Sequence, residues 1–304
     1  MIGRICYWVI NMSIVASFMG LIVMLLRKIR FIPRRVSVFL WIISFLRMTV
    51  PVGLNSPYSL MSLVSRFTTK TVTVYQPSDD IAFSFSNSIR AAESYSPITY
   101  KVNILGTVFS VAGMIWIVVS LALLIALTII YVSTKNAVAD SRHLESNIFF
   151  SDKVDSPAVY GIIRPKIIIP GSYKDMELKY IIRHEKTHIK RLDNLWRIIG
   201  FITASIHWFN PLSWVFLKAF LNDLELACDE MAVSGYDKEE RKEYARTLLE
   251  CSQSKSMLVS AFGGAKVRTR IENVLSYKKM TAFSAIGFTL LVMVIIYTLV
   301  TNAG

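Results

Sequence analysis

Four apolar runs, each close to the length that crosses a membrane as one helix, constrain the fold of this 304-residue chain most strongly. They cover about residues 6–26, 36–52, 104–132 and 281–300, and a helix needs about 20 residues to span the hydrocarbon core. Composition agrees, because 53% of the residues are hydrophobic and only 18% are charged, against about 25% in soluble domains. We therefore expect a mainly α membrane protein with four transmembrane helices.

Basic residues indicate how these spans are oriented. A cluster of them lies between the first and second runs, at Arg27, Lys28, Arg30, Arg34 and Arg35. Short basic loops stay in the cytoplasm, so alternation places the 55–103 loop outside the cell and residues 134–280 in the cytoplasm. The first run has its basic residues mainly after it, unlike a signal peptide, and we expect it to be retained as a span.

The balance of basic and acidic residues indicates which kind of molecule the chain contacts. The inner segment 134–280 has 23 basic and 18 acidic residues, a net charge of about +5, which favours contact with anionic lipid head groups. Nucleic-acid binding could use the same charge, but no base-reading motif accompanies it, so we expect no direct nucleic-acid partner.

The three cysteines are scattered, which is typical of reduced thiols. Arg47 lies inside the second run, where it must reach the membrane edge or face a polar partner.

The pentapeptide HEKTH begins at His184 and ends at His188, within a stretch, 176–199, whose pattern predicts one helix. Residues four apart on a helix are turned about 40° from each other and lie about 6 Å apart along the axis. Both imidazoles can therefore bind one tetrahedral Zn²⁺. Glu185 can polarise a water molecule in the open coordination position and act as general base. The motif predicts a zinc metalloendopeptidase.

A third ligand for such a site is available further along the chain. Glu225 would complete a His₂Glu site and leave the fourth position to water. Asp229, one helical turn later, could accept the free N–H of a liganding histidine and orient its ring. The alternative is an ordinary acidic, solvated helix face. Beside an HExxH motif we favour the ligand role for Glu225 and the supporting role for Asp229.

The segment 195–221 is apolar enough to count as a fifth span, but Asn210-Pro211 interrupts it. A full crossing would also place Glu225 on the opposite side of the membrane from His184 and His188. We therefore expect a helical hairpin that is either buried or dips into the membrane interface.

Two β-branched runs, 159–163 and 166–170, are separated by Arg164-Pro165 and predict a β-hairpin. This hairpin is either purely structural or offers an edge strand to which an extended substrate peptide adds. Small residues at 260–264 indicate a linker that the protein could cleave itself. The alternative there is a plain loop before an amphipathic helix at the membrane surface.

Taken together, these motifs resemble the BlaR/MecR-type antirepressor metallopeptidases, which are integral membrane zinc proteases of bacteria. The matching residues run in the family's order along nearly the whole chain: Trp41, Leu46-Arg47 and Pro51; Tyr160-Gly161 to Pro165 and Ile169-Pro170; His184–Asp193; and Trp208–Leu212 followed by Glu225–Asp229. The last pairing is the most distinctive, and the combination is far more specific than HExxH alone.

The resemblance implies a domain organisation and a site. Residues 1–133 would form three transmembrane helices with the outer loop, 134–280 a cytoplasmic gluzincin-like α+β metalloprotease domain, and 281–304 a fourth transmembrane helix with a short tail. The zinc ligands would be His184, His188 and Glu225, with Glu185 as the catalytic base and Asp229 behind the ligands. In the family, activation leads to self-cleavage and to loss of a DNA-binding repressor, so a cytoplasmic repressor of the BlaI/MecI type is the expected substrate.

The chain departs from the family at its end. Well-known members continue past the fourth span into an extracellular penicillin-binding sensor, whereas this chain ends at Gly304. Either the sequence is part of a longer chain, or sensing passes through a separate protein or through the outer loop. Homodimer formation stays open.

Two other functions fit parts of the pattern. A membrane quality-control protease of the HtpX kind would have a similar site, and a neighbouring repressor gene would favour signalling over that function. A non-catalytic transmembrane scaffold would need a closed, structural metal site.

Overall fold

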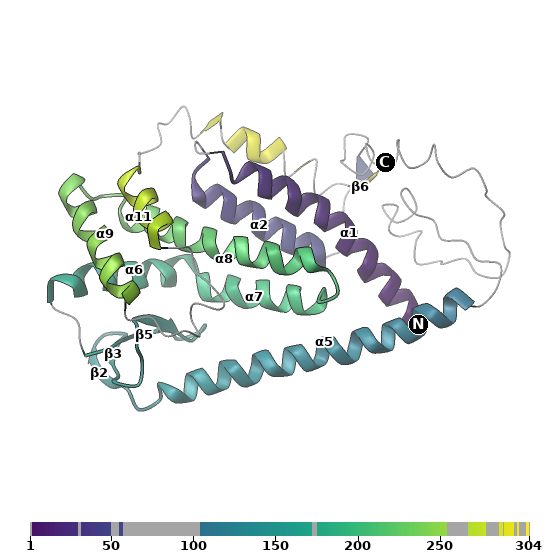
Figure 1. The fold of residues 1–304 in the computed structure, drawn as a ribbon, viewed down its shortest axis with the longest axis horizontal. Coiled ribbons are helices and arrows are strands. Elements are labelled where there is room, and N and C mark those ends of the chain that lie inside the picture. The colour runs from purple at the N-terminus through teal and green to yellow at the C-terminus, as the bar shows by residue number, and fades with distance from the viewer. Residues whose placement is uncertain are drawn as a thin grey trace.

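The computed structural model describes residues 2–29, 32–49, 55–56, 104–171, 175–253, 267–277, 286–287, 289–294, 297 and 302–303. Four helices form a bundle, with further helices and a small sheet gathered at one end of it (Figure 1). The bundle contains α1 (Ile2–Leu26), α2 (Arg34–Thr49), α7 (Asp193–Ile206) and α8 (Pro211–Ala232). The helices gathered at one end of the bundle are α6 (Asp175–Arg191), α9 (Lys238–Gln253) and α11 (Val267–Leu275).

Among the described residues, two helices are long and apolar enough to cross a membrane: Ile5–Leu26 of α1 and Gly106–Ala137 of α5 (Ile104–Ala137). Only 6% of the most apolar window of α5 is buried inside the protein, so its apolar surface faces outward, as a helix in lipid requires. The expectation of four spans is thus met in part. The second expected span is α2, which has 16 residues and falls short of the usual length.

The fourth expected span, 281–300, lies largely outside the described residues, as do the loop at 57–103 and the linker at 260–264. These three expectations stay predictions. Two short strands near them, β1 (Asn55–Ser56) and β6 (Asn302–Ala303), pair in parallel.

Small residues allow α5 to cross α1 closely. A Cβ atom on Gly3 would lie 3.2 Å from Ser110, and one on Gly113 would lie 2.6 Å from the Ile2 side chain. Close approach through small residues is typical of helix pairs in membranes. Farther along, the Trp116 indole N–H donates to the Ile206 carbonyl at 2.7 Å, which joins α5 to the end of α7.

The segment 195–221 folds as the predicted helical hairpin, with α7 and α8 on either side of a turn. Asn210 is the N-cap of α8 and accepts from the Leu212 N–H at 2.9 Å, and proline follows in the first turn, an arrangement that favours a helix start. The Asn210 amide also donates to the hydroxyls of Ser13 and Ser17 on α1, each at 2.8 Å. The turn is therefore anchored to the first span.

The prediction of one helix over 176–199 is wrong. Leu192 has φ 57° and ψ 33°, a left-handed conformation that an L-residue adopts only at a cost. This residue ends α6 and lets α7 start in a new direction at Asp193. The gain that offsets the strain is a contact of Asp193 at the candidate site, described below.

The predicted β-hairpin is present as β4 (Ala158–Tyr160) and β5 (Lys166–Ile169), paired antiparallel with Val159 opposite Ile167. Two further strands come from the polar stretch before it, β2 (Arg142–Glu145) and β3 (Ile148–Phe150), which the sequence pattern did not indicate. The sheet order is β2-β3-β5-β4, with β3 and β5 parallel. The central β5 is buried, and β4 is an edge strand.

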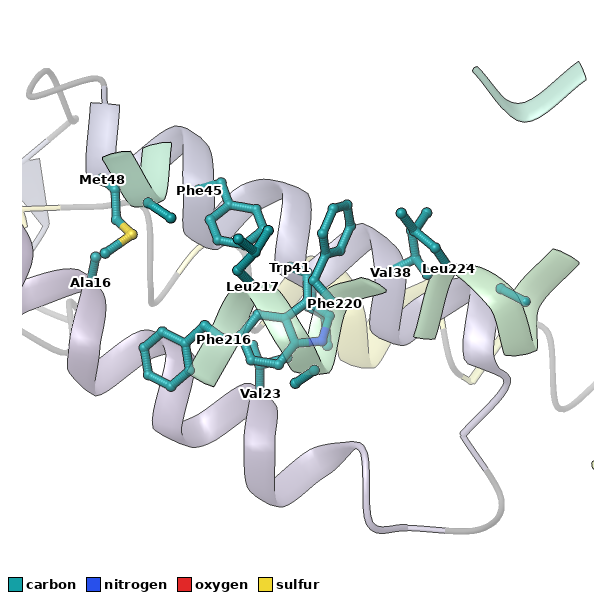
Figure 2. Close-up of a cluster of buried hydrophobic side chains, with 14 residues drawn as sticks. Ala16, Val23, Val38, Trp41, Phe45, Met48, Phe216, Leu217, Phe220 and Leu224 are labelled. Carbon is teal, nitrogen blue, oxygen red and sulfur yellow. The ribbon is translucent and has the colours of Figure 1, made fainter. Parts of the chain in front are cut away.

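The main hydrophobic core lies where α1, α2 and α8 meet, and aromatic rings dominate it (Figure 2). Trp41 packs against Phe216 with ring centroids 5.4 Å apart, and Phe45 packs edge-on against Phe220 at 5.1 Å. Arg47, on the same helix as Trp41, is only 4% exposed, so its side chain lies inside the protein and not at a membrane edge.

Gly20 on α1 is where this core is tightest, since an added Cβ would lie 2.2 Å from the Phe216 ring. We expect Gly20→Ala to lower the free energy of unfolding by about 1–3 kcal/mol, because overpacking forces the ring or the helix to move. Thermal unfolding in detergent micelles measures this. Gly287→Ala is the control, since among the described residues no neighbouring atom lies within 4 Å of a Cβ added there. Equal melting temperatures for the two variants would contradict the close packing of α1 on α8.

Candidate metal centre

His184 and His188 lie side by side on α6, as their spacing predicts, and both are buried. Their Nε2 atoms are 3.1 Å apart, and their rings are nearly perpendicular, at 85°. Two imidazole nitrogens thus face one point in space. This part of the arrangement follows directly from the helix, because residues at i and i+4 share one face.

Glu225 reaches the same point from α8, 37 residues after the second histidine. One carboxylate oxygen lies 3.8 Å from Nε2 of His184 and the other 3.8 Å from Nε2 of His188. In a tetrahedral zinc site with ligand bonds of about 2.0–2.1 Å, ligand atoms are separated by about 3.3 Å. The three donor groups are within about half an ångström of that spacing, so the residues present fit a zinc ion.

Glu185 lies next to these groups in a cavity of about 230 Å³, which Tyr160 of the edge strand β4 also lines. The Glu185 residue is 8% exposed. Burial raises the pKa of Tyr160, and the negative charges of Glu185 and Asp155 raise it further. The cavity therefore brings together the predicted metal-binding groups, the predicted base and an edge strand.

Each histidine has a polar partner on its other ring nitrogen. Nδ1 of His188 lies 2.7 Å from a carboxylate oxygen of Asp193, and Nδ1 of His184 lies 2.8 Å from the Tyr244 hydroxyl. The Tyr244 hydroxyl donates to Asp229 at 2.7 Å, and Asp229 itself lies 3.3 Å from the same histidine nitrogen. Partners of this kind fix the tautomer and the orientation of a liganding histidine.

Asp229 reaches His184 both directly and through Tyr244, a residue that the sequence did not point to; its role in supporting a liganding histidine stays a prediction. Asp193 was missed as well, although an acidic residue five positions after the second histidine is a usable signal once the helix is known to break at Leu192. For Tyr244 no local signal exists, because it lies 60 residues from His184 and comes from α9.

Arg270 on α11 is a further member of the site that sequence reasoning missed. Its guanidinium donates two hydrogen bonds to Asp229, at 2.7 and 2.8 Å, and lies 3.4 Å from Glu225. It also approaches Nε2 of His184 at 3.2 Å. Burial alone would raise the pKa of Asp229, but Arg270 outweighs it and lowers that pKa to about 2. Arg197 of α7 forms a second, short ion pair with Glu225.

Cys228 provides a competing donor set, because His184, His188 and Cys228 are also close enough together to hold a metal ion. The Cys228 sulfur lies 3.7 Å from Nδ1 of His184 and donates to the His184 carbonyl at 3.5 Å. However, that Nδ1 already contacts Tyr244, whereas both Nε2 atoms face the Glu225 carboxylate. The geometry favours Glu225 over Cys228 as the third donor.

Comparison with known proteins identifies the family of the chain. Residues 7–274 match the family model described as BlaR1 peptidase M56. Among curated relatives, the methicillin resistance mecR1 protein of Staphylococcus aureus is 26% identical over 144 residues, or 44% of this chain. The regulatory proteins BlaR1 of Bacillus licheniformis and of Staphylococcus aureus are each 29% identical, over 46% and 48% of this chain. The matches span about a quarter of each relative's length, namely 25%, 26% and 28%.

Arg270 provides a test of how the site is held together. We expect Arg270→Ala to lower the free energy of unfolding by about 3 kcal/mol, since it leaves the fully buried Asp229 without its cation. Chemical unfolding in detergent with a chelator present measures this. Arg268→Ala is the matched control on the same helix, because the Arg268 side chain is 90% exposed. A loss no larger than that of the control would show that Arg270 does not stabilise the site.

Proposed function

We propose that this chain, which belongs to the BlaR1 peptidase M56 family, is a membrane-bound zinc endopeptidase of a BlaR/MecR-like signalling system. One observation carries the proposal: two histidine Nε2 atoms 3.1 Å apart converge with both oxygens of Glu225, beside Glu185 in one cavity. In this proposal His184, His188 and Glu225 bind zinc. Glu185 is the general base, and Asp229 lies behind the ligands.

Several residues of the site have a defined part in the proposed peptide hydrolysis. When bound, a zinc ion would polarise a water molecule and the substrate carbonyl. Glu185 takes a proton from the water molecule while the water oxygen attacks the carbonyl carbon. Glu185 then delivers that proton to the departing amine nitrogen as the C–N bond breaks. Asp193 and the Tyr244–Asp229 pair hold the two imidazoles with Nε2 facing inward.

We propose that the substrate binds as an extended peptide along β4. This strand is at the edge of the sheet and lines the cavity, and edge strands accept an added strand through main-chain hydrogen bonds. The Asn194 amide donates to the carbonyls of Val159 and Gly161, at 2.9 and 3.2 Å. Asn194 thus holds β4 in place beside the catalytic groups.

The site is proposed to face the cytoplasm. Arg27, in the basic turn between α1 and α2, pairs with Asp223, two residues before Glu225. The basic turn and the metal centre therefore lie at the same end of the bundle, and short basic loops remain on the cytoplasmic side. A cytoplasmic repressor of the BlaI/MecI type is the substrate that we propose, alongside self-cleavage.

Glu185→Gln and His188→Ala test the assignment of roles. We expect Glu185→Gln to keep one bound zinc per chain and to lose at least 100-fold in cleavage rate, because a general base contributes about that much or more. His188→Ala should lose the metal as well. Zinc is measured by elemental mass spectrometry, and cleavage with a BlaI/MecI-type repressor and with casein.

Glu177→Gln is the control, since it makes the same chemical change on the same helix. Undiminished cleavage by Glu185→Gln would rule out the proposed mechanism. Cleavage of casein alone would favour a quality-control protease of the HtpX kind. Bound zinc with no cleavage in the unmodified chain would favour a non-catalytic scaffold.

The histidine partners give a separate prediction. We expect Asp193→Asn and Tyr244→Phe each to weaken zinc binding about 10–100-fold, because loss of such partners lets the imidazoles turn. Competition with a chromogenic chelator measures the affinity. Asp140→Asn should leave it unchanged, as Asp140 is an exposed partner of Lys153. Equal affinities for all three variants would show that these contacts do not orient the ligands.

A further inference from the structure

Helix α8 carries two pairs of acidic residues on different faces. Glu225 and Asp229 face the candidate metal centre. Asp223 and Glu230, seven residues apart, lie within about 20° of each other around the helix and about 100–160° from the first pair. All four belong to the same rigid helix, Pro211–Ala232. The second pair has no part in the proposed chemistry, yet both of its residues are buried.

Asp223 is fully buried and accepts three hydrogen bonds, two from the turn between α1 and α2 and one from α2. Arg27 donates through Nε and Nη2 at 2.9 and 2.8 Å, one to each carboxylate oxygen. The Trp41 indole N–H donates to the same carboxylate at 2.9 Å. Figure 2 shows Trp41 among Val23, Phe216 and Phe220. The indole is therefore held in place by packing.

Glu230 forms a second attachment about two helical turns farther on. Its carboxylate accepts from the backbone N–H of Arg34, at 3.1 and 3.3 Å. The Arg34 side chain in turn donates to the Arg27 carbonyl at 2.8 Å. The turn between α1 and α2 thus contacts α8 at two points about 10 Å apart along its axis, which sets both the rotation and the axial position of the helix.

Rotation of α8 matters because side-chain ends lie about 5–6 Å from a helix axis. A rotation of about 10° would displace the Glu225 carboxylate by roughly 1 Å, whereas metal–ligand distances tolerate only about 0.2 Å. Contacts on the face of α8 that packs against α1 and α2 therefore determine where the Glu225 carboxylate lies on the face that would hold the metal.

We propose that Asp223 is a positioning residue: by pairing with Arg27 and Trp41 it sets the rotation of α8 and so the place of the Glu225 carboxylate. This links the α1–α2 turn to the metal centre through one rigid helix. The inference rests on the proposed zinc site but concerns a different face of the helix. It assigns a function to a buried carboxylate that the hydrolysis step does not use.

A double-mutant cycle on zinc affinity tests this. The protein in detergent is titrated with zinc against a competing chelator, for Asp223→Asn, Glu225→Gln and the double variant. We expect Asp223→Asn to raise the zinc dissociation constant about 10-fold when Glu225 is present. In the Glu225→Gln background it should have no effect, because the residue through which Asp223 acts has lost its charge. Coupling of this kind is what neighbouring, interdependent groups show.

Trp41→Phe is the second variant, because it keeps the ring packing and the Arg27 pair while removing one donor to Asp223. It should weaken zinc binding in the same direction, by about threefold. Lys218→Ala on the exposed side of α8 is the control and should leave the affinity unchanged. A merely structural role of Asp223 would lower the melting temperature without changing zinc affinity.

Two results would overturn the proposal: an unchanged zinc affinity in Asp223→Asn and Trp41→Phe, or an equal loss in both Glu225 backgrounds. Failure of the proposed function would look different. In that case the unmodified chain would bind no zinc, or Glu185→Gln would cleave normally, whatever substitution is made at Asp223.

Discussion

Four carboxylates on one helix are largely removed from water, and the surrounding structure is arranged to compensate for them. Asp223 and Asp229 are fully buried, and Glu225 and Glu230 nearly so. A buried charge without a partner costs several kcal/mol, so α8 can take its place only when cations reach it. The partners come from three separate elements: Arg27 near α1, Arg197 on α7 and Arg270 on α11. Each pair joins one of these elements to α8, and together they hold the end of the bundle that contains the candidate site.

The path of the chain makes this arrangement possible. Because α7 leaves the site and α8 returns after the turn at Asn210, Glu225 reaches two histidines that lie on α6. The Asn210 side chain caps α8 and also contacts two serines of α1. The same return places another face of α8 against α1 and α2, so that one helix contacts both the candidate metal centre and α1, a candidate membrane span.

Much of the candidate site could be predicted from residue types and spacing. The i, i+4 spacing of His184 and His188 determines their shared face, and the same spacing relates Glu225 to Asp229. The hairpin at Asn210 could be inferred because a crossing would have separated the ligands. The continuous helix over 176–199 was a wrong prediction, since nothing in a good helical pattern shows that Leu192 adopts a positive φ. The break places Asp193 against His188 and Arg191, contacts that appear once the chain has folded. The β2–β3 hairpin was likewise hidden in a polar stretch, because its pairing with β5 is not local.

The sequence alone thus determined the elements that depend on local residue patterns. These are the apolar helices, the helix with the HExxH motif, the turn at Asn210-Pro211 and the β-hairpin around Arg164-Pro165. Tertiary structure alone decided which partners these elements have. Tyr244 lies 60 residues from His184, Arg270 lies 41 from Asp229, and Trp41 lies 182 from Asp223. Periodicity carries no information over such separations, because hydrogen bonds and ion pairs form between whichever groups the packed helices bring within about 3 Å.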